Sequence, residues 1–437
     1  MGFIEEQQLE SAYVMGTYAR KPVELVRGRG MRVEDAEGRT YLDFVSGVGA
    51  VSLGHCHPAL VSAIEEQAST LVHVSNYYYI EHRGEVAHLV SDLLNECVDE
   101  GERTPWQSFF ANSGAEANEC AFKLARLHAK KRAMAAAEAA GADEDGVRAA
   151  AAAAPRLIVT LDASAAAAPR LIVTLDASFH GRTLATLAAT AQPAKQEAFQ
   201  PLPDGFVRTP INDIKALESL FASQGDGICA VMVECVQGES GVHPCTAEFL
   251  AAVRRLTAEC GALFMCDEIQ CGMYRCGTHP FGFQHFGVTP DVVTIAKGIA
   301  SGFPMGMCAA RAQVAASFDP GDHGSTFGGS CLAVAAAEAT VRALAAEDAA
   351  GNAERTGAYL REKLTALPQV EEVRGLGLMV ACDLAEGVSA PDVVLAGLDE
   401  GLLLNFTGPR TLRFLPPLVC SKEDVDVLVQ KLAALLS

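Results

Sequence analysis

The chain has 437 residues, of which half are hydrophobic and one fifth are charged, and its formal net charge is −20. This length favours two domains, and the composition excludes a disordered protein. The negative charge argues against nucleic-acid and membrane partners, so any bound phosphate must be held locally by backbone amides.

The first residues and the cysteines predict a cytoplasmic protein. The start of the chain has no basic and apolar signal segment, and no apolar run is long enough to span a membrane. The fourteen cysteines form no Cys-x-x-Cys pair, and the spacing of Cys266, Cys271 and Cys276 fits no zinc site. We therefore expect reduced thiols and no metal.

The N-terminal part predicts a lesser domain. Short alternating runs between Tyr18 and Phe44 indicate small strands. Pro58 suits the first turn of a helix that continues through Gln67, and a second amphipathic helix is expected over residues 83–94.

A strand, a turn of small residues and a helix follow each other from Trp106. The strand covers residues 106–110, the turn contains Ser113, Gly114 and Ala115, and the helix covers residues 116–128. Free amides and the helix dipole at such a turn can bind an anion. A plain turn with an N-capping serine would have the same pattern.

The next segment contains an insertion and a repeat. Residues from about 130 to 154 are rich in alanine and charge, which predicts a surface helix or an irregular excursion. Residues 151–164 recur letter for letter at 165–178. Only the second copy leads directly into Phe179, so we expect Arg170–Leu175 in the sheet and the first copy displaced.

Three buried strands then end on ionisable residues. They cover residues 228–234, 262–266 and 291–297 and lead to Glu234, Asp267 and Lys297. Strands that alternate with helices predict a parallel, doubly wound sheet, whose ligands bind at the carboxyl ends of the strands. Beyond a long helix from residue 331, short strands and a final helix predict a second, α+β domain.

Lys297 and Asp267 together suggest a particular chemistry. A buried lysine at a strand end has a lowered pKa and can act as a nucleophile, although it could also be a cap that extends to solvent. An aspartate at a neighbouring strand end is what pyridoxal phosphate needs at its ring nitrogen, although aspartate is also common in turns. The turn at Ser113, the aromatic Phe179 and the cationic Arg182 favour the first interpretation.

These residues lie in stretches that resemble the class III aminotransferases of pyridoxal-phosphate (PLP) fold type I, in particular the acetylornithine aminotransferases of arginine biosynthesis. The stretches cover nearly the whole chain apart from the inserted region, and their order makes the resemblance specific. They are residues 53–58 (LGHCHP), 112–118 (NSGAEAN), 178–183 (SFHGRT), 234–241 (ECVQGESG), 267–272 (DEIQCG), 296–298 (AKG) and 323–329 (HGSTFGG).

The resemblance implies an α/β fold of two domains. The large PLP-binding domain, with a mostly parallel doubly wound sheet, would cover residues 72–325 and carry the insertion at about 130–164. The smaller α+β domain would be built from both termini, residues 1–71 and 326–437.

The resemblance also implies a role for each matching residue. Lys297 would bind the cofactor covalently and move a proton, and Asp267 would pair with the ring nitrogen. The other expected cofactor contacts are Ser113, Gly114 and Ala115 at the phosphate, Phe179 on the ring face, Glu268, Ile269 and Gln270 beside the ring, and Thr326 of the partner subunit in a homodimer.

Four residues would bind substrate. Arg182 would take the substrate carboxylate, and Ser325 would be a further contact. Glu239 would neutralise Arg413 while an amine is bound and swing away when 2-oxoglutarate needs that arginine. The implied reaction moves the terminal amino group of N-acetylornithine to 2-oxoglutarate, giving N-acetylglutamate 5-semialdehyde and glutamate.

Two departures and two alternatives accompany this resemblance. Cys235 replaces a proline that is usual in the family, and Ser330-Cys331 replaces Asn-Pro; both flank the site, so we expect changed loop rigidity and retained chemistry. The amino donor could also be ornithine, succinylornithine, 4-aminobutyrate or N-succinyl-diaminopimelate. A PLP-binding scaffold without activity is the alternative from another class.

Overall fold

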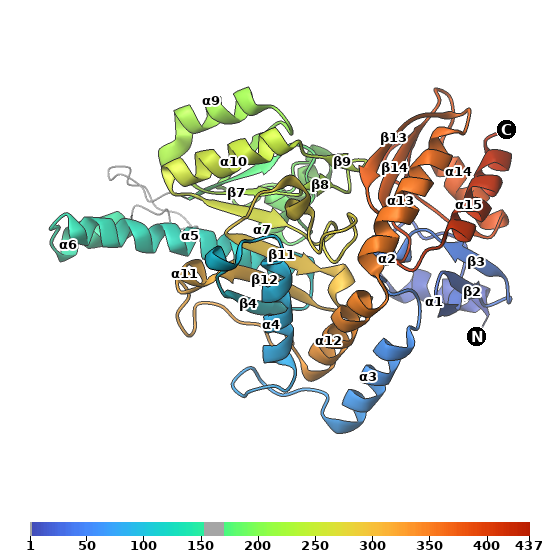
Figure 1. Cartoon of the computed structure of the whole chain (residues 1–437), viewed down its shortest axis with the longest axis horizontal. Helices are drawn as coiled ribbons and strands as arrows, with labels where there is room; N and C mark the ends of the chain where they lie inside the picture. Colours follow the sequence, from blue (N-terminus) through green and yellow to red (C-terminus); the bar gives the residue numbers. More distant parts are fainter. Residues whose placement is uncertain (1, 153–169) are drawn as a thin grey trace.

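A seven-stranded sheet forms the centre of the large domain. The computed structural model describes residues 2–152 and 170–437 (Figure 1). In spatial order the strands are β4 (Trp106–Ala111), β12 (Gly306–Arg311), β11 (Val292–Ala296), β10 (Leu263–Asp267), β7 (Ile228–Val233), β5 (Leu171–Leu175) and β6 (Phe206–Thr209).

The sheet is parallel except at β12. Strand β12 runs antiparallel to both β11 and β4, while β10 pairs in parallel with β11 and with β7. The register places Asp267 opposite Thr294, three residues before Lys297. Asp267 and Lys297 therefore lie at the same edge of the sheet, where the parallel strands end.

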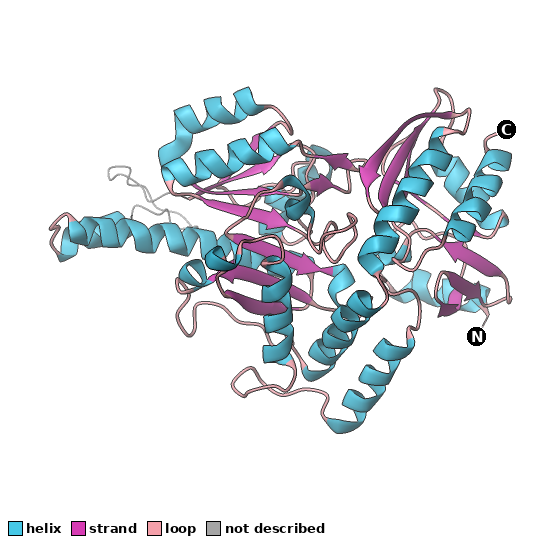
Figure 2. Ribbon diagram, in the orientation of Figure 1, coloured by secondary structure: helices cyan, strands magenta, loops and turns pink. Residues whose placement is uncertain are grey.

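Helices cover both faces of this sheet (Figure 2). Side chains that alternate along a strand point to opposite faces, and the core divides accordingly. Ala230 and Met232 pack with α5 (Gly114–Ala139), whereas Val231 and Val233 belong to the cluster that contains α10 (Ala247–Cys260). The other helices of this domain are α4 (Arg83–Leu94), α6 (Glu144–Ala152), α7 (Leu184–Ala189), α8 (Pro193–Gln196), α9 (Ile214–Gln224) and α11 (Ala312–Ala315).

Two four-stranded sheets form the smaller part of the molecule. One has the order β1 (Leu25–Arg29), β2 (Arg32–Asp35), β3 (Thr40–Asp43) and β15 (Leu402–Leu403); the other has the order β13 (Val370–Leu376), β14 (Met379–Leu384), β17 (Thr411–Phe414) and β16 (Asn405–Phe406). Because β15 pairs with β3, the first sheet joins segments from both ends of the chain. The expected fold class is thereby confirmed.

The remaining elements connect these sheets. They are α1 (Phe3–Tyr13), α2 (Ser46–Gly49), α3 (Pro58–Thr70), α12 (Cys331–Ala346), α13 (Ala349–Thr365), α14 (Ala390–Asp399), α15 (Lys422–Leu435), β8 (Val236–Gln237) and β9 (His243–Pro244). Within the described ranges, no helix is both long and apolar enough to cross a membrane.

The repeat and the insertion can now be placed in part. Strand β5 comes from the second copy and pairs with β6 and β7, so the expectation for Arg170–Leu175 is confirmed. The first copy lies almost wholly within residues 153–169, outside the described residues. The helix expected to end at residue 128 instead continues to Ala139, and α6 follows it, so the two helices project from the side of the sheet (Figure 1).

Candidate active site

A cavity of about 400 Å³ opens at the carboxyl edge of the sheet. It contains most of the residues that the sequence pointed to. Its lining includes Ser113, Gly114, Ala115, Phe179, Arg182, Asp267, Ile269, Gln270 and Lys297.

Lys297 follows β11 directly and begins a short 3-10 helix, Lys297–Ala300. Its φ of +49° lies in the left-handed region, which is uncommon for a residue with a side chain. Its side chain enters the cavity and makes no ion pair within the described residues. Burial lowers the pKa of Lys297, and the charges of Glu239 and Asp267 oppose that shift in part, so more of the amine is neutral than on an ordinary lysine.

Asp267 is 3% exposed and is held by three donors. Its Oδ2 accepts a hydrogen bond from Asn118 Nδ2 at 2.9 Å and lies 2.8 Å from His180 Nδ1. Its Oδ1 accepts from the Ile269 amide at 3.1 Å. Asn118 is itself fixed, because its Oδ1 accepts from Thr294 Oγ1 at 2.7 Å. The carboxylate is thus held in one orientation at the cavity wall.

The charges around Asp267 influence one another. Burial acts to lower the pKa of His180, but the hydrogen bond and charge of Asp267, together with Glu234, outweigh it and raise that pKa. Burial raises the pKa of Glu234 to about 7. The sequence motifs contained Asn118 and His180, but we had assigned no role to either. Asn118 lies in an alanine-rich helix, and His180 follows a buried strand. Polar side chains at positions where burial is expected need hydrogen-bonding partners, and this signal could have identified both residues.

The turn before α5 has the geometry that an anion cradle requires. Ser113 is the N-cap of this long helix, and its Oγ accepts from the Glu116 amide at 3.3 Å. Ser113, Gly114 and Ala115 line the cavity with the N-terminus of α5. A Cβ at Gly114 would come within 2.7 Å of the Ile269 side chain, so this close approach requires glycine. The helix N-terminus can therefore bind an anion inside the cavity.

Phe179 lines the cavity and has two cations around its ring. Its amide donates to Glu234 Oε2 at 3.0 Å. The Arg182 guanidinium carbon lies 5.6 Å from the ring centroid, and Lys195 Nζ lies 5.0 Å from the same centroid. Sequence reasoning had not selected Lys195.

Glu239 and Arg413 form the expected ion pair next to the cavity. Arg413 Nη1 lies 2.7 Å from Glu239 Oε1, and it also donates to Gln270 Oε1 at 3.3 Å. Burial acts to raise the pKa of Glu239, but the charge of Arg413 outweighs it and lowers that pKa. Asn405 was not anticipated: its Oδ1 accepts from Arg413 Nε at 3.0 Å and from Nη2 at 2.8 Å. The guanidinium therefore stays anchored even if Glu239 moves away.

The side chain of Glu268 lies outside the Lys297 cavity. Its carboxyl group accepts from the amides of Gly282 at 2.7 Å and Phe283 at 2.9 Å. Burial raises its pKa to about 8. These two bonds fix the side chain against a neighbouring loop, and the contact expected between Glu268 and the cofactor remains a prediction.

Ser325 and Thr326 lie outside the Lys297 cavity within one chain. They line a neighbouring cavity of about 310 Å³ with Phe327. Asn112 lines both cavities, and its Nδ2 donates to Ser325 Oγ at 3.2 Å. The roles expected for Ser325 and Thr326 remain predictions.

Both departures from the family pattern are accommodated by local structure. Cys235 is fully buried, and its Sγ lies 3.8 Å from Cys266 Sγ and within 4.8 Å of a carboxylate oxygen of Glu268. Ser330 is the N-cap of α12, where its Oγ accepts from the Ala333 amide at 3.4 Å. Neither residue enters the Lys297 cavity.

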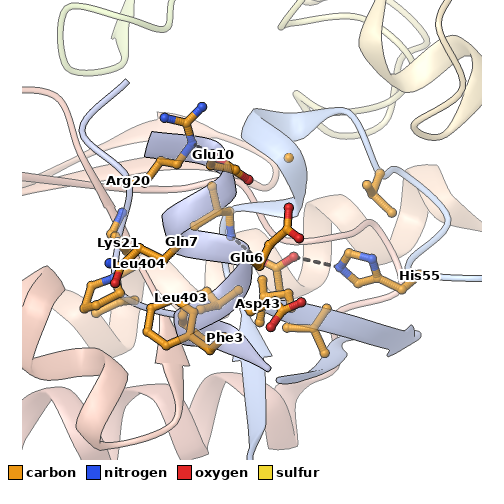
Figure 3. Close-up of a pocket in the computed structure, with 18 of the residues that line it drawn as sticks. Phe3, Glu6, Gln7, Glu10, Arg20, Lys21, Asp43, His55, Leu403 and Leu404 are labelled. Atoms are coloured by element: carbon orange, nitrogen blue, oxygen red, sulfur yellow. Dashed lines mark hydrogen bonds and ion pairs between the residues drawn. The ribbon is translucent and has the colours of Figure 1, made fainter. Parts of the chain in front are cut away.

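A larger cavity of about 690 Å³ lies between α1 and the sheet of β1, β2, β3 and β15 (Figure 3). Its wall carries the pair of Asp43 and His55, whose Oδ2 and Nε2 atoms are 2.8 Å apart. Val51 lines this cavity while the adjacent Ala50 lines the Lys297 cavity, so one loop separates the two. None of the expected site residues lies in the larger cavity.

Known proteins resemble this chain along its whole length. A protein named acetylornithine aminotransferase from Caldanaerobacter subterraneus subsp. tengcongensis is 41% identical to this chain, and the match covers 98% of both chains. A protein of the same name from Methanocaldococcus jannaschii is 40% identical, over 97% of this chain and 96% of the relative. The ornithine aminotransferase of Toxoplasma gondii ME49 superposes with a TM-score of 0.83 at 28% identity, over 100% of this chain and 95% of that one. An acetylornithine aminotransferase from Elizabethkingia anophelis superposes with a TM-score of 0.79 at 30% identity, over 100% of this chain and 99% of that one.

The cavity also has the chemical groups that the family's cofactor requires. Pyridoxal phosphate carries an aldehyde, a ring nitrogen and a phosphate, for which the cavity offers the amine of Lys297, the carboxylate of Asp267 and the amides at Ser113. The family model for aminotransferase class-III matches residues 15–436. The chain therefore belongs to the class-III aminotransferases, the family whose cofactor is pyridoxal 5′-phosphate.

Proposed function

We propose that the chain transfers the δ-amino group of N-acetylornithine to 2-oxoglutarate and so produces N-acetylglutamate 5-semialdehyde and glutamate, a step of arginine biosynthesis. The single observation that carries a transaminase reaction is the cavity in which Lys297 and Asp267 face the N-terminus of α5. The choice of N-acetylornithine is supported by eight relatives of that name at 38–42% identity.

In this proposal each side chain has a limited task. The bound cofactor supplies an electron sink for the bond-breaking step. Lys297 Nζ holds the cofactor and moves a proton during the reaction, while Asp267 binds the ring nitrogen and is kept in position by Asn118 and His180. The amides of residues 113–115 bind the phosphate, and Phe179 packs on the ring.

Substrate recognition is assigned to Arg182, which lines the cavity, and to the pair of Glu239 and Arg413 next to it. Arg182 takes the carboxylate that is remote from the reacting carbon. The pair of Glu239 and Arg413 alternates between the two substrates: Glu239 covers the arginine while the amine is bound and releases it for the α-carboxylate of 2-oxoglutarate. The anchoring of Arg413 by Asn405 supports this alternation.

A second candidate has a specific observation in its favour. The solved ornithine aminotransferase of Toxoplasma gondii superposes with a higher TM-score, 0.83, than the acetylornithine enzyme of Elizabethkingia anophelis, 0.79. Ornithine, the amino donor in the name of that structural neighbour, is the competing donor.

The test is a comparison of kcat/KM for N-acetylornithine, ornithine and 4-aminobutyrate, with 2-oxoglutarate as the acceptor. We expect N-acetylornithine to be preferred. A preference of about tenfold for ornithine or 4-aminobutyrate, which corresponds to about 1.4 kcal/mol in the transition state, would replace the proposed donor. A purified holoenzyme that turns over none of the three would support the scaffold alternative instead.

A homodimer with shared active sites is part of the proposal. Phe327 is 60% exposed beside Thr326, and Tyr77 and Tyr79 are almost fully exposed. The loop that contains these tyrosines is tied to this region, because Asn76 Nδ2 donates to the Ser325 carbonyl at 2.8 Å. A second copy of the chain would cover these apolar residues and bring Thr326 of the partner subunit to the phosphate; light scattering that shows an active monomer would contradict it.

We further propose the domain division given by the resemblance, residues 72–325 against residues 1–71 with 326–437. The pairing of β15 with β3 supports it. All fourteen cysteines are free thiols, which supports the expected cytoplasmic location.

A further inference from the structure

Lys195 is a cation beside the active site to which the proposed reaction assigns no task. It lies on α8, and its Nζ is 5.0 Å from the centroid of the Phe179 ring, on which the guanidinium of Arg182 also converges at 5.6 Å. Neither Lys195 nor Arg182 forms an ion pair with any carboxylate of the described residues. The two cations thus converge on the ring of Phe179, which lines the Lys297 cavity together with Arg182, while Lys195 lies next to that lining.

The backbone that carries Lys195 is firmly held. The buried side chain of Gln196 donates through Nε2 to the carbonyls of Leu187 at 2.8 Å and Thr190 at 2.6 Å. The side chain of Gln192 donates through Nε2 to the Ser178 carbonyl at 3.1 Å, directly before Phe179. These bonds connect α8 to the end of β5, so the position of the lysine relative to Phe179 is determined by buried contacts and not by a free surface loop.

The surroundings of Lys195 favour the arrival of an anion. The side chain is half-buried, and burial lowers the pKa of its ammonium group. Glu239 opposes this shift, whereas Arg182 and Arg413 add to it by repulsion. Glu239 is already paired with Arg413, and Glu234 accepts from the Phe179 amide, so within the described residues no carboxylate forms an ion pair with Lys195 or Arg182.

We propose that Lys195 and Arg182 together hold the carboxylate that lies far from the reacting carbon, and that this pair selects substrates with such a carboxylate. The inference rests on the proposed function, in which Arg182 alone had that task. The preferred ligands are dicarboxylate keto acids, such as 2-oxoglutarate, and amino donors that carry a carboxylate at the end opposite the reacting amine. A lysine that served only to cover the Phe179 ring would not discriminate between substrates.

The experiment compares two keto acids on the variants Lys195→Gln and Lys195→Arg of the holoenzyme. 2-Oxoglutarate has the remote carboxylate, and pyruvate lacks it. Loss of one charge-assisted contact predicts that Lys195→Gln lowers kcat/KM for 2-oxoglutarate about tenfold, mainly through KM, while the value for pyruvate changes less than about twofold. Lys195→Arg should recover most of the loss. The matched control is Lys215→Gln, which removes an exposed lysine from α9 and should leave both values unchanged.

Binding of glutarate gives a readout that does not depend on turnover. This unreactive dicarboxylate, followed by calorimetry, should bind about tenfold more weakly to Lys195→Gln than to the unaltered protein. Equal losses on 2-oxoglutarate and pyruvate would overturn the proposal in favour of a structural role, and so would unchanged glutarate binding. An unaltered protein that fails to turn over 2-oxoglutarate would refute the proposed function, while glutarate binding would still decide the role of Lys195.

Discussion

Asn405 provides a sharp test of how one cavity accepts two different substrates. Its Oδ1 accepts two hydrogen bonds from the guanidinium of Arg413, at 2.8 and 3.0 Å. While an amine is bound, Arg413 is also held by Glu239. When Glu239 withdraws for 2-oxoglutarate, Asn405 becomes the main side chain that orients the guanidinium. The variant Asn405→Ala should therefore impair one half of the reaction more than the other.

The magnitude follows from the two lost contacts. Arg413 is 3% exposed, so bonds to its charged group are worth about 1.5–3 kcal/mol. This range corresponds to a loss of roughly tenfold to a hundredfold in kcat/KM for 2-oxoglutarate. For the amino donor, the ion pair with Glu239 compensates, and the loss should stay below about threefold.

Single-turnover absorbance measurements can follow the two half-reactions separately. The matched control is Asn95→Ala, which also removes two side-chain hydrogen bonds, to the carbonyls of Ser91 and Thr104 at 2.9 and 3.0 Å, but at the end of α4. It should affect stability without distinguishing the half-reactions. Equal losses in both half-reactions of Asn405→Ala, or none in either, would refute the alternation of Glu239.

Three further predictions concern the site and the sheet. Asn118→Ala removes one donor from Asp267 and leaves the hydroxyl of Thr294 without its acceptor. Thermal or urea unfolding should therefore show a free energy of unfolding that is lower by about 1–3 kcal/mol, and kcat should fall. Unchanged stability and activity would contradict the hydrogen-bond network around Asp267. The folded protein holds a proton on Glu268 up to about pH 8, whereas the unfolded chain releases it near pH 4.5. The contribution of this group to stability therefore falls as the pH rises between these values, and the stability of the unaltered protein relative to Glu268→Gln should decrease from pH 6 to pH 8.5 in urea unfolding; a constant difference would contradict the raised pKa. Deletion of residues 151–164 should preserve kcat/KM, because β5 comes from the second copy; loss of the folded state would show that the first copy is needed.

The strand ends of the site were predictable because they depend on local sequence. Buried parallel strands are short runs of apolar residues, and the ionisable residues that follow them must lie at one edge of the sheet. Asp267 and Lys297 are therefore found where the pattern indicated. The turn at Ser113 and the helix that follows it were predictable for the same reason, since they are contiguous in the chain.

Other features depend on contacts between distant segments. Strand β12 consists largely of small residues, and its position between β4 and β11 follows from pairing with both neighbours, so no strand was expected there. Asn118 and Asn405 act through partners that lie 149 and 8 residues away along the chain, and only the folded arrangement identifies them. The resemblance placed Glu268 beside the cofactor with Ile269 and Gln270, but only the folded structure shows that its side chain bonds to the amides of Gly282 and Phe283.

The central claim is that Lys297 is the residue that binds the cofactor. Borohydride reduction of the purified holoenzyme, followed by peptide mass spectrometry, tests it most directly. The structure predicts that the added mass of the reduced cofactor is found on the peptide that contains Lys297, and that Lys297→Ala abolishes both this mass and turnover. Cofactor attached to another lysine, or full activity of Lys297→Ala, would contradict the claim.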